Sequence, residues 1–157
     1  MAAPTPQHER SDRSIENLIA RYAELVDAGD FGGLGELFSE GVFGGEGDAV
    51  VGGQEAVEKI FRAMVRVYED GTPRTKHVTT NIRIDVDADA GTAESRSYVT
   101  VFQALPDMAM QPIVAGRYRD VFVCRDGVWR FTERHFTTDL VGDVSRHLLV
   151  GPEVLAS

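Results

Sequence analysis

The strongest constraint on the fold is a change in hydrophobic period at about Thr75. Before it, apolar residues recur at the three- and four-residue spacing of helices, and after it they alternate with polar residues, as in half-buried strands. Helices followed by a run of long strands are typical of an α+β domain, with helices on one face of an antiparallel sheet. We therefore expect a strongly curved antiparallel sheet with helices packed on its concave face, forming a cone with an internal cavity.

Three helices are expected before the change in period. The first begins at about residue 12 and ends before Gly29, a residue type that often stops helices, and the third covers residues 54–68. Between them, Asp30 is a cap for a short, glycine-rich helix. Residues 42–43 and 49–51 are expected to form two short strands.

Four long strands are expected after the change in hydrophobic period. The first begins at Thr75, and the other three cover residues 92–105, 113–124 and 128–139. A loop is expected at 106–112 and a two-residue hairpin turn at Asp126-Gly127. We expect a disordered lead-in over residues 1–11, a cone domain over residues 12–140, and a tail over residues 141–157 with a short helix near residues 144–149.

Composition restricts the class of protein. The chain has 157 residues and a formal net charge of −9, which fits a single domain and disfavours nucleic acid or an anionic membrane as a partner. No apolar segment is long enough to span a membrane, and the first residues do not have the pattern of a signal peptide, so we expect a cytoplasmic protein. The four histidines form no metal-binding spacing and no phosphate-binding motif is present, so we expect neither a metal nor another cofactor.

His77 is the main candidate for acid–base chemistry, because an imidazole titrates near neutral pH. It would need a carboxylate to orient it, and Asp27 is a candidate at the edge of the apolar stripe of the first helix. Strict alternation from Ile84 would turn His77 outward, so a bulge within residues 77–81 is required if it is to enter the cavity. A core or surface histidine and a solvated aspartate remain the alternatives.

Other candidates come from the same helix and from the strands. Tyr22 lies in the apolar stripe, where a tyrosine is either a core residue or a hydrogen-bond donor to a bound molecule. Tyr98 and Tyr118 lie on the second and third long strands. His135 shares its phase with two aromatic residues of the last strand and is expected at the mouth of the cavity.

The order of four segments resembles the SnoaL-like family of the nuclear-transport-factor-2-like cone fold, nearest to the scytalone dehydratase and bile acid 7α-dehydratase branch. The resemblance covers about residues 12–139 and depends on the segments YAELVDAGDFGGLGELFSE, VVGGQEAVEKIF, TKHVTTNIRIDVDADAGTAESRSYVTVF and AGRYRDVFVCRDGVWRFTER. It implies catalytic roles for Tyr22, Asp27 and His77. At the position of the second catalytic histidine of scytalone dehydratase, this chain has Val101 or Phe102, and Tyr118 stands where that enzyme has an asparagine.

The resemblance implies a cofactor-independent lyase or isomerase, similar to a dehydratase, that acts on a hydrophobic polyketide- or steroid-like molecule. His77 and Asp27 would abstract a proton, Tyr22 would assist, and Tyr118, Tyr98, Phe102 and His135 would bind the substrate. The alternative is a non-catalytic module that binds a ligand or serves as the small subunit of a ring-hydroxylating dioxygenase. By analogy with the family, a homodimer or homotrimer is expected.

Overall fold

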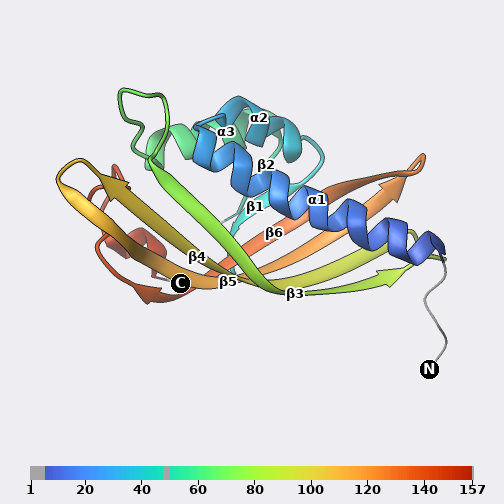
Figure 1. Cartoon of the computed structure of the whole chain (residues 1–157). Helices are drawn as coiled ribbons and strands as arrows, with labels where there is room; N and C mark the ends of the chain where they lie inside the picture. The colour runs from blue at the N-terminus through green and yellow to red at the C-terminus, as the bar shows by residue number, and fades with distance from the viewer. Residues whose placement is uncertain (1–5, 48–49, 157) are drawn as a thin grey trace.

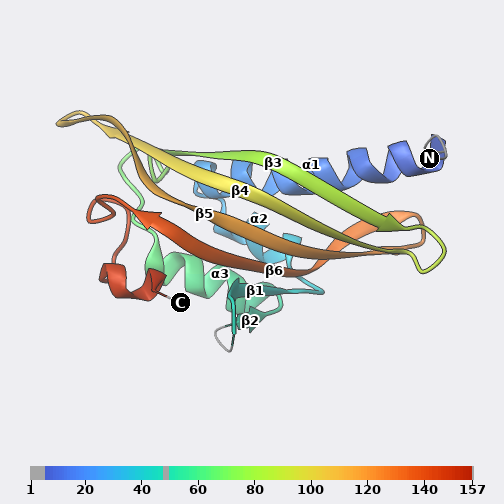
Figure 2. The same ribbon diagram turned by 90° about the horizontal axis from the view of Figure 1, so that it is seen from below.

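A curved sheet of six strands forms one layer, and the helices lie across its concave face (Figure 1). This computed structural model describes residues 6–47 and 50–156. The strand order is β2-β1-β6-β5-β4-β3, and the view from below shows the four long strands side by side (Figure 2). The expected α+β cone is confirmed.

The helices are α1 (Pro6–Ala28), α2 (Phe31–Leu37) and α3 (Gln54–Met64). The helix expected from about residue 12 already begins at Pro6, so part of the expected lead-in is helical, and residues 1–5 lie outside the described residues. Gly29 ends α1 with a φ of 71°, and the N–H groups of Gly29 and Asp30 donate to the carbonyls of Val26 and Leu25. Asp30 then caps α2 by accepting the Gly33 N–H at 2.8 Å, as expected.

The strands are β1 (Val42–Gly45), β2 (Val50–Gly52), β3 (Thr75–Asp87), β4 (Thr92–Leu105), β5 (Met108–Arg125) and β6 (Val128–Val141). All adjacent strands are antiparallel except β1 and β6, which are parallel, so the expectation of a purely antiparallel sheet was wrong at this pair. The loop expected at 106–112 is also wrong, because β5 begins at Met108, opposite Leu105. Ala49 of the expected second strand lies outside the described residues.

The C-terminal segment differs most from expectation. No helix forms near residues 144–149, and a short 3-10 helix, η1 (Pro152–Leu155), follows instead. The Arg66 N–H donates to the His147 carbonyl and the Leu149 N–H donates to the Met64 carbonyl, each at 2.8 Å. These bonds draw the segment beside the end of α3 (Figure 2) and end that helix four residues earlier than its apolar pattern predicted.

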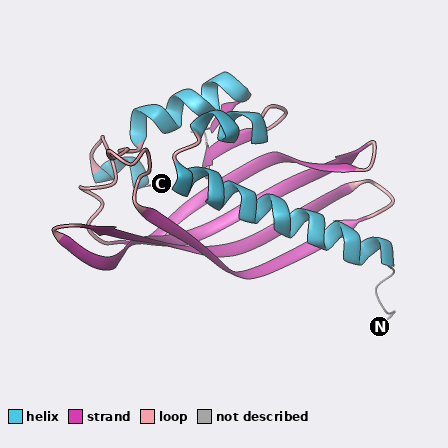
Figure 3. Cartoon of the chain, turned by 45° about the horizontal axis from the view of Figure 1, so that its top comes forward, coloured by secondary structure: helices cyan, strands magenta, loops and turns pink. Residues whose placement is uncertain are grey.

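The core lies between the concave face of the sheet and the helices, with α1 crossing over the strands (Figure 3). The largest fully buried side chains include four phenylalanines and one arginine: Phe31, Phe38, Phe122, Phe131 and Arg134. Within the described residues, none of the helices combines the length and the apolar character needed to cross a bilayer.

Candidate functional site

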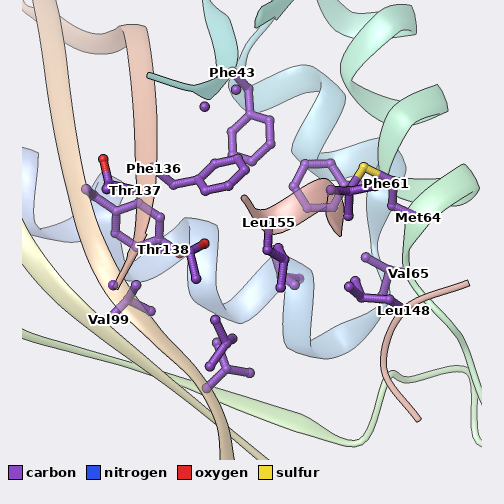
Figure 4. A pocket seen from close by; sticks show the side chains of 18 of the residues that line it. Phe43, Phe61, Met64, Val65, Val99, Phe136, Thr137, Thr138, Leu148 and Leu155 are labelled. Carbon is purple, nitrogen blue, oxygen red and sulfur yellow. The ribbon is translucent and has the colours of Figure 1, made fainter. Parts of the chain in front are cut away.

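A cavity of about 470 Å³ opens between the sheet, α1, α3 and the C-terminal segment. Aromatic and aliphatic side chains dominate its wall, with Phe43, Phe61 and Phe136 on one side and Leu148 and Leu155 of the C-terminal segment facing them (Figure 4). The titratable side chains on the wall are few: Tyr22, Glu46, His77, Tyr118 and His147. A mostly apolar wall with a few convergent polar groups is typical of sites that bind small molecules.

His77 lines the cavity and is paired with Asp27 at the end of α1. Its Nδ1 lies 2.6 Å from Asp27 Oδ1, and its backbone N–H donates to Asp27 Oδ2 at 2.8 Å. Thr75 Oγ1 donates a third hydrogen bond to this carboxylate at 2.9 Å. Only 8% of the His77 side chain and 10% of the Asp27 side chain are exposed, so the pair is largely screened from water.

A bulge in β3 gives His77 this direction. Two residues, Asn81 and Ile82, lie between the pairs Thr80–Tyr98 and Arg83–Arg96, where β4 has a single residue. Asn81 adopts a left-handed φ of 55°. The extra residue reverses the alternation, so that His77 and Ile84 face the same side. The predicted bulge is present, at the end of the predicted segment, and Ile82 is exposed rather than directed at the helices.

The carboxylate fixes which His77 nitrogen is available. Burial raises the pKa of Asp27, but the hydrogen bonds and the charge of His77 outweigh it, and the pKa is held below its ordinary value. Asp27 is therefore ionised at neutral pH and accepts a hydrogen bond from Nδ1–H. The neutral imidazole then has its lone pair on Nε2, the nitrogen that the carboxylate does not occupy.

Tyr22 lies next to His77 on the cavity wall, and Tyr118 lies next to Tyr22. The Tyr22 ring meets the His77 ring edge-on at 6.4 Å between centroids and the Tyr118 ring at 5.7 Å. Burial, helped by Tyr118, raises the pKa of Tyr22 well above its ordinary value, and burial also raises the pKa of Tyr118. Both hydroxyls are therefore protonated at neutral pH and are hydrogen-bond donors.

The buried ion pair Arg134–Asp120 packs against the rings of Tyr22 and Tyr118. The Arg134 guanidinium lies 4.3 Å from the Tyr22 ring centre and 3.9 Å from that of Tyr118, while its Nε and Nη2 donate to Asp120 at 2.8 Å. Neither side chain of the ion pair has any exposed surface. Burial alone would lower the pKa of Arg134, but Asp120 raises it, so the guanidinium remains charged.

Three residues expected to bind a substrate do not line the cavity. Tyr98 is 54% exposed, because Ser97 and Val99 on either side of it point inward, and Phe102 alternates in the same way with Val101. His135 is engaged by Glu133, whose Oε2 lies 2.8 Å from Nε2, and lies near the Gly45 carbonyl. The expected positions of Tyr98, Phe102 and His135 on the cavity wall were therefore wrong.

The misplacement of His135 has a specific cause. The pairing of β6 with β5 shifts after Phe131, which lies opposite Phe122, to Glu133, which lies opposite Val121. One extra residue, Thr132, reverses the alternation, so that Arg134 is fully buried and His135 points elsewhere. No pattern in the sequence of β6 marked this bulge.

His147 is a site residue that the sequence analysis did not identify. It lies on the cavity wall with 7% of its surface exposed, although the sequence assigned it to a tail. Burial, together with the charge of nearby His77, lowers its pKa to about 4, while Asp27 opposes this. Its position depends on long-range hydrogen bonds of the C-terminal segment, so a local pattern could not reveal it.

Among the described residues, no group of three or more histidine, cysteine, aspartate or glutamate side chains is placed to hold a metal ion.

The chain belongs to the SnoaL-like domain family, whose model matches residues 8–135. The match covers most of the described chain, including both members of the Asp27–His77 pair. A comparison with curated proteins gives no significant match.

Solved structures with the same fold include a protein from Novosphingobium aromaticivorans DSM 12444 that carries a provisional assignment as a scytalone dehydratase. It is 23% identical, with a TM-score of 0.70, over 89% of this chain and 91% of that chain. An NTF2-like protein with a cystatin-like fold from Novosphingobium aromaticivorans is 22% identical, with a TM-score of 0.69, over 88% of this chain and 87% of that chain.

The hexachlorocyclohexane dehydrochlorinase LinA-type3 from Novosphingobium barchaimii LL02 is similar in structure as well. It is 20% identical, with a TM-score of 0.68, over 92% of this chain and 94% of that chain. At these identities the likenesses establish the NTF2-like cone fold, and the chemistry of this chain has to be argued from its own residues.

Proposed function

We propose that the protein is a cofactor-independent lyase or isomerase that removes a proton from a carbon next to a carbonyl in a hydrophobic small molecule. The observation that carries the proposal is the 2.6 Å contact between Asp27 and His77 in the wall of an apolar cavity. The names of two similar structures, a scytalone dehydratase and a dehydrochlorinase, describe eliminations and agree with this class of reaction.

In the proposed reaction, the lone pair of His77 Nε2 takes the proton. The electrons of the broken C–H bond move toward the carbonyl, whose oxygen becomes an enolate, and the imidazole becomes an imidazolium. Ionised Asp27 stabilises this cation through Nδ1 and holds the ring in its productive orientation. An apolar surrounding strengthens both effects, because little water competes with the carboxylate.

Tyr22 and Tyr118 are the proposed donors to the developing enolate oxygen. Both hydroxyls remain protonated at neutral pH, and Arg134 against their rings adds a positive potential close by. In a dehydration, one of them would instead donate its proton to the leaving hydroxyl. In an isomerisation, the imidazolium of His77 would return its proton to another carbon.

The second candidate function is a non-catalytic ligand-binding module or a structural subunit. It is favoured by β4, where the residues that face the cavity are Val99 and Val101, which have no acid–base function. A large oxygenase subunit encoded beside this chain would support the subunit role.

The test uses 2-tetralone, a bicyclic ketone whose hydrogens next to the carbonyl are exchanged for deuterium by the proposed proton abstraction. Binding is first established by a rise in Tm, and exchange in D₂O is then followed by NMR. The wild-type protein should accelerate exchange, and His77→Ala should lower the protein-catalysed rate by roughly 10²–10⁴-fold, because the base is lost.

Two further variants serve as comparisons. Asp27→Asn should lower the exchange rate by at least about 10²-fold, because an amide no longer fixes the tautomer. His135→Ala removes a histidine outside the cavity and should retain the wild-type rate. Equal exchange by wild type and His77→Ala, at a ketone concentration that raises Tm, contradicts the proposed reaction and favours the binding module.

A further inference from the structure

His147 contributes an imidazole to the cavity from the C-terminal segment, whereas His77 comes from β3 and Tyr22 from α1. Its side chain is buried, and its Nδ1 has no hydrogen-bond partner among the described residues. The residue lines the cavity, and a buried imidazole without a hydrogen bond is unfavourable unless a bound molecule supplies one to the ring.

The C-terminal segment holds His147 firmly in this position. The backbone of His147 accepts a hydrogen bond from Arg66 at 2.8 Å and donates one to Val144 at 3.0 Å. The carbonyl of Arg146, the preceding residue, accepts hydrogen bonds from Tyr68 Oη and from Gln103 Nε2. The backbone that carries the imidazole is thus held by several hydrogen bonds that leave the ring itself available to a ligand, as a preorganised binding group requires.

The charge state of the ring suits a hydrogen bond to an oxygen atom. With burial lowering its pKa to about 4, His147 is neutral at pH 7, so one nitrogen donates and the other accepts. His77, in contrast, has its Nδ1 committed to Asp27. The cavity therefore contains one imidazole with a carboxylate partner and one without.

We propose that His147 is a substrate-binding residue that forms a hydrogen bond with a hydroxyl or carbonyl oxygen of the hydrophobic molecule in the cavity. The inference deepens the proposed function, on which it rests for the class of ligand. The ligand is then an apolar ring system that carries at least two oxygens, one for the tyrosines beside His77 and one for His147.

The experiment compares 1-naphthol with naphthalene, which differ by a single hydroxyl. Dissociation constants are measured by fluorescence titration for wild type, His147→Leu, His147→Asn, His77→Leu and the control His135→Leu. Wild type should bind 1-naphthol about tenfold more tightly than naphthalene, as one buried hydrogen bond allows. His147→Leu should lose most of this preference while its affinity for naphthalene changes less than about twofold.

The remaining variants separate a hydrogen bond from a structural effect. His147→Asn keeps a polar group at the position of Nδ1 and should recover part of the preference, and His135→Leu should behave as wild type. In ¹⁵N-histidine-labelled wild type, 1-naphthol should shift the side-chain resonance that is missing from the His147→Leu spectrum. The shift itself is measured on the wild-type protein, and the variant serves only to assign the resonance.

A hydroxyl preference that persists in His147→Leu, or is absent from wild type, overturns the proposal. Loss of the preference in His77→Leu but not in His147→Leu does so as well, because the hydroxyl then binds at the other imidazole. The proposed function is judged by deuterium exchange of 2-tetralone, so either result can fail while the other holds.

Discussion

The low pKa of His147, about 4, couples folding to pH. An unfolded chain binds a proton at this histidine below about pH 6.5, whereas the native state does not bind it until about pH 4. The unfolded state is therefore favoured as pH falls through this range. The pKa of Asp27 is lowered from 3.8, so this carboxylate stabilises the native state above pH 3.8, and the stabilisation is lost in more acidic solution. The effect of His147 and the effect of Asp27 on stability therefore fall in different pH ranges.

We predict that replacing His147 makes the protein less sensitive to mild acid. Between pH 6.5 and 4, the wild-type free energy of unfolding should fall by about 3 kcal/mol more than that of His147→Leu, as the lowered pKa requires. Urea unfolding at several pH values measures the difference. Parallel pH profiles for the two proteins would show that His147 is protonated as easily in the native state as in the unfolded chain.

The Arg134–Asp120 pair allows a test of what burial adds to an ion pair. Arg117 and Asp139 have the same two-bond geometry on the surface, with side chains 54% and 42% exposed, whereas the buried pair has no exposed surface. Asp120→Asn should lower the free energy of unfolding by about 3–5 kcal/mol, because Arg134 is left buried and unpaired. Asp139→Asn should cost less than about 1 kcal/mol. Similar losses in urea unfolding would contradict this distinction.

The sequence and the resemblance together identified Tyr22, His77 and Tyr118 on the cavity wall but not Glu46 or His147. Asp27 was recognisable as a carboxylate at the edge of the apolar stripe of the first helix, His77 was recognisable as an imidazole suited to acid–base chemistry, and the resemblance implies catalytic roles for both. His147 was not recognisable, because the segment around it has no clear period and takes its position from bonds to Arg66 and Met64. His135 was placed wrongly because a bulge at Thr132 leaves no local mark in the sequence.

Among the elements, the end of α1 determines where Asp27 lies. Gly29 adopts a left-handed φ of 71°, and a Cβ there would lie 2.3 Å from the Gly71 carbonyl oxygen. Gly71 has a similar φ of 81°, but a Cβ there would meet nothing within 4 Å. The two glycines therefore share the backbone strain that a substitution would introduce and differ in the space available.

We predict that Gly29→Ala is clearly more destabilising than Gly71→Ala. The second change should cost about 1–2 kcal/mol from the left-handed backbone alone. The first should cost about 1–3 kcal/mol more, because the chain must move away from the methyl group. Urea unfolding of both variants checks the difference. Equal losses in the free energy of unfolding would mean that the chain at Gly71 moves away from the Gly29→Ala methyl group without destabilising the protein.

Regular elements were predictable where pattern and tertiary contacts agree. The amphipathic start of α3 and the hairpin at Asp126-Gly127 followed from local signals, and both residues of that turn have the positive φ that it requires. The end of α3 did not, because Val65 forms a β-bridge with Leu148, more than eighty positions later. The parallel pairing of β1 with β6 was equally invisible, since neither strand carries a mark of its partner.

For the whole molecule, the expectation of a homodimer or homotrimer stays a prediction. Large apolar side chains are exposed on strands β3 and β4, among them Val78 at 42% and Tyr98 at 54%. Light scattering after gel filtration should give a mass of two or three chains, and Tyr98→Glu should lower it. Val128 is 50% exposed at the end of a hairpin, and Val128→Glu should leave the mass unchanged. A monomeric wild type would contradict the prediction.

An imidazole that is bound to the wall through both its ring and its backbone can approach a flat molecule from one face only. The two hydrogens on a CH₂ group beside a carbonyl would then no longer be equivalent. Deuterium would enter one of these prochiral positions faster than the other, and the product would be optically active. The rigidity of the Asp27–His77 contact thus sets the handedness of the proposed chemistry.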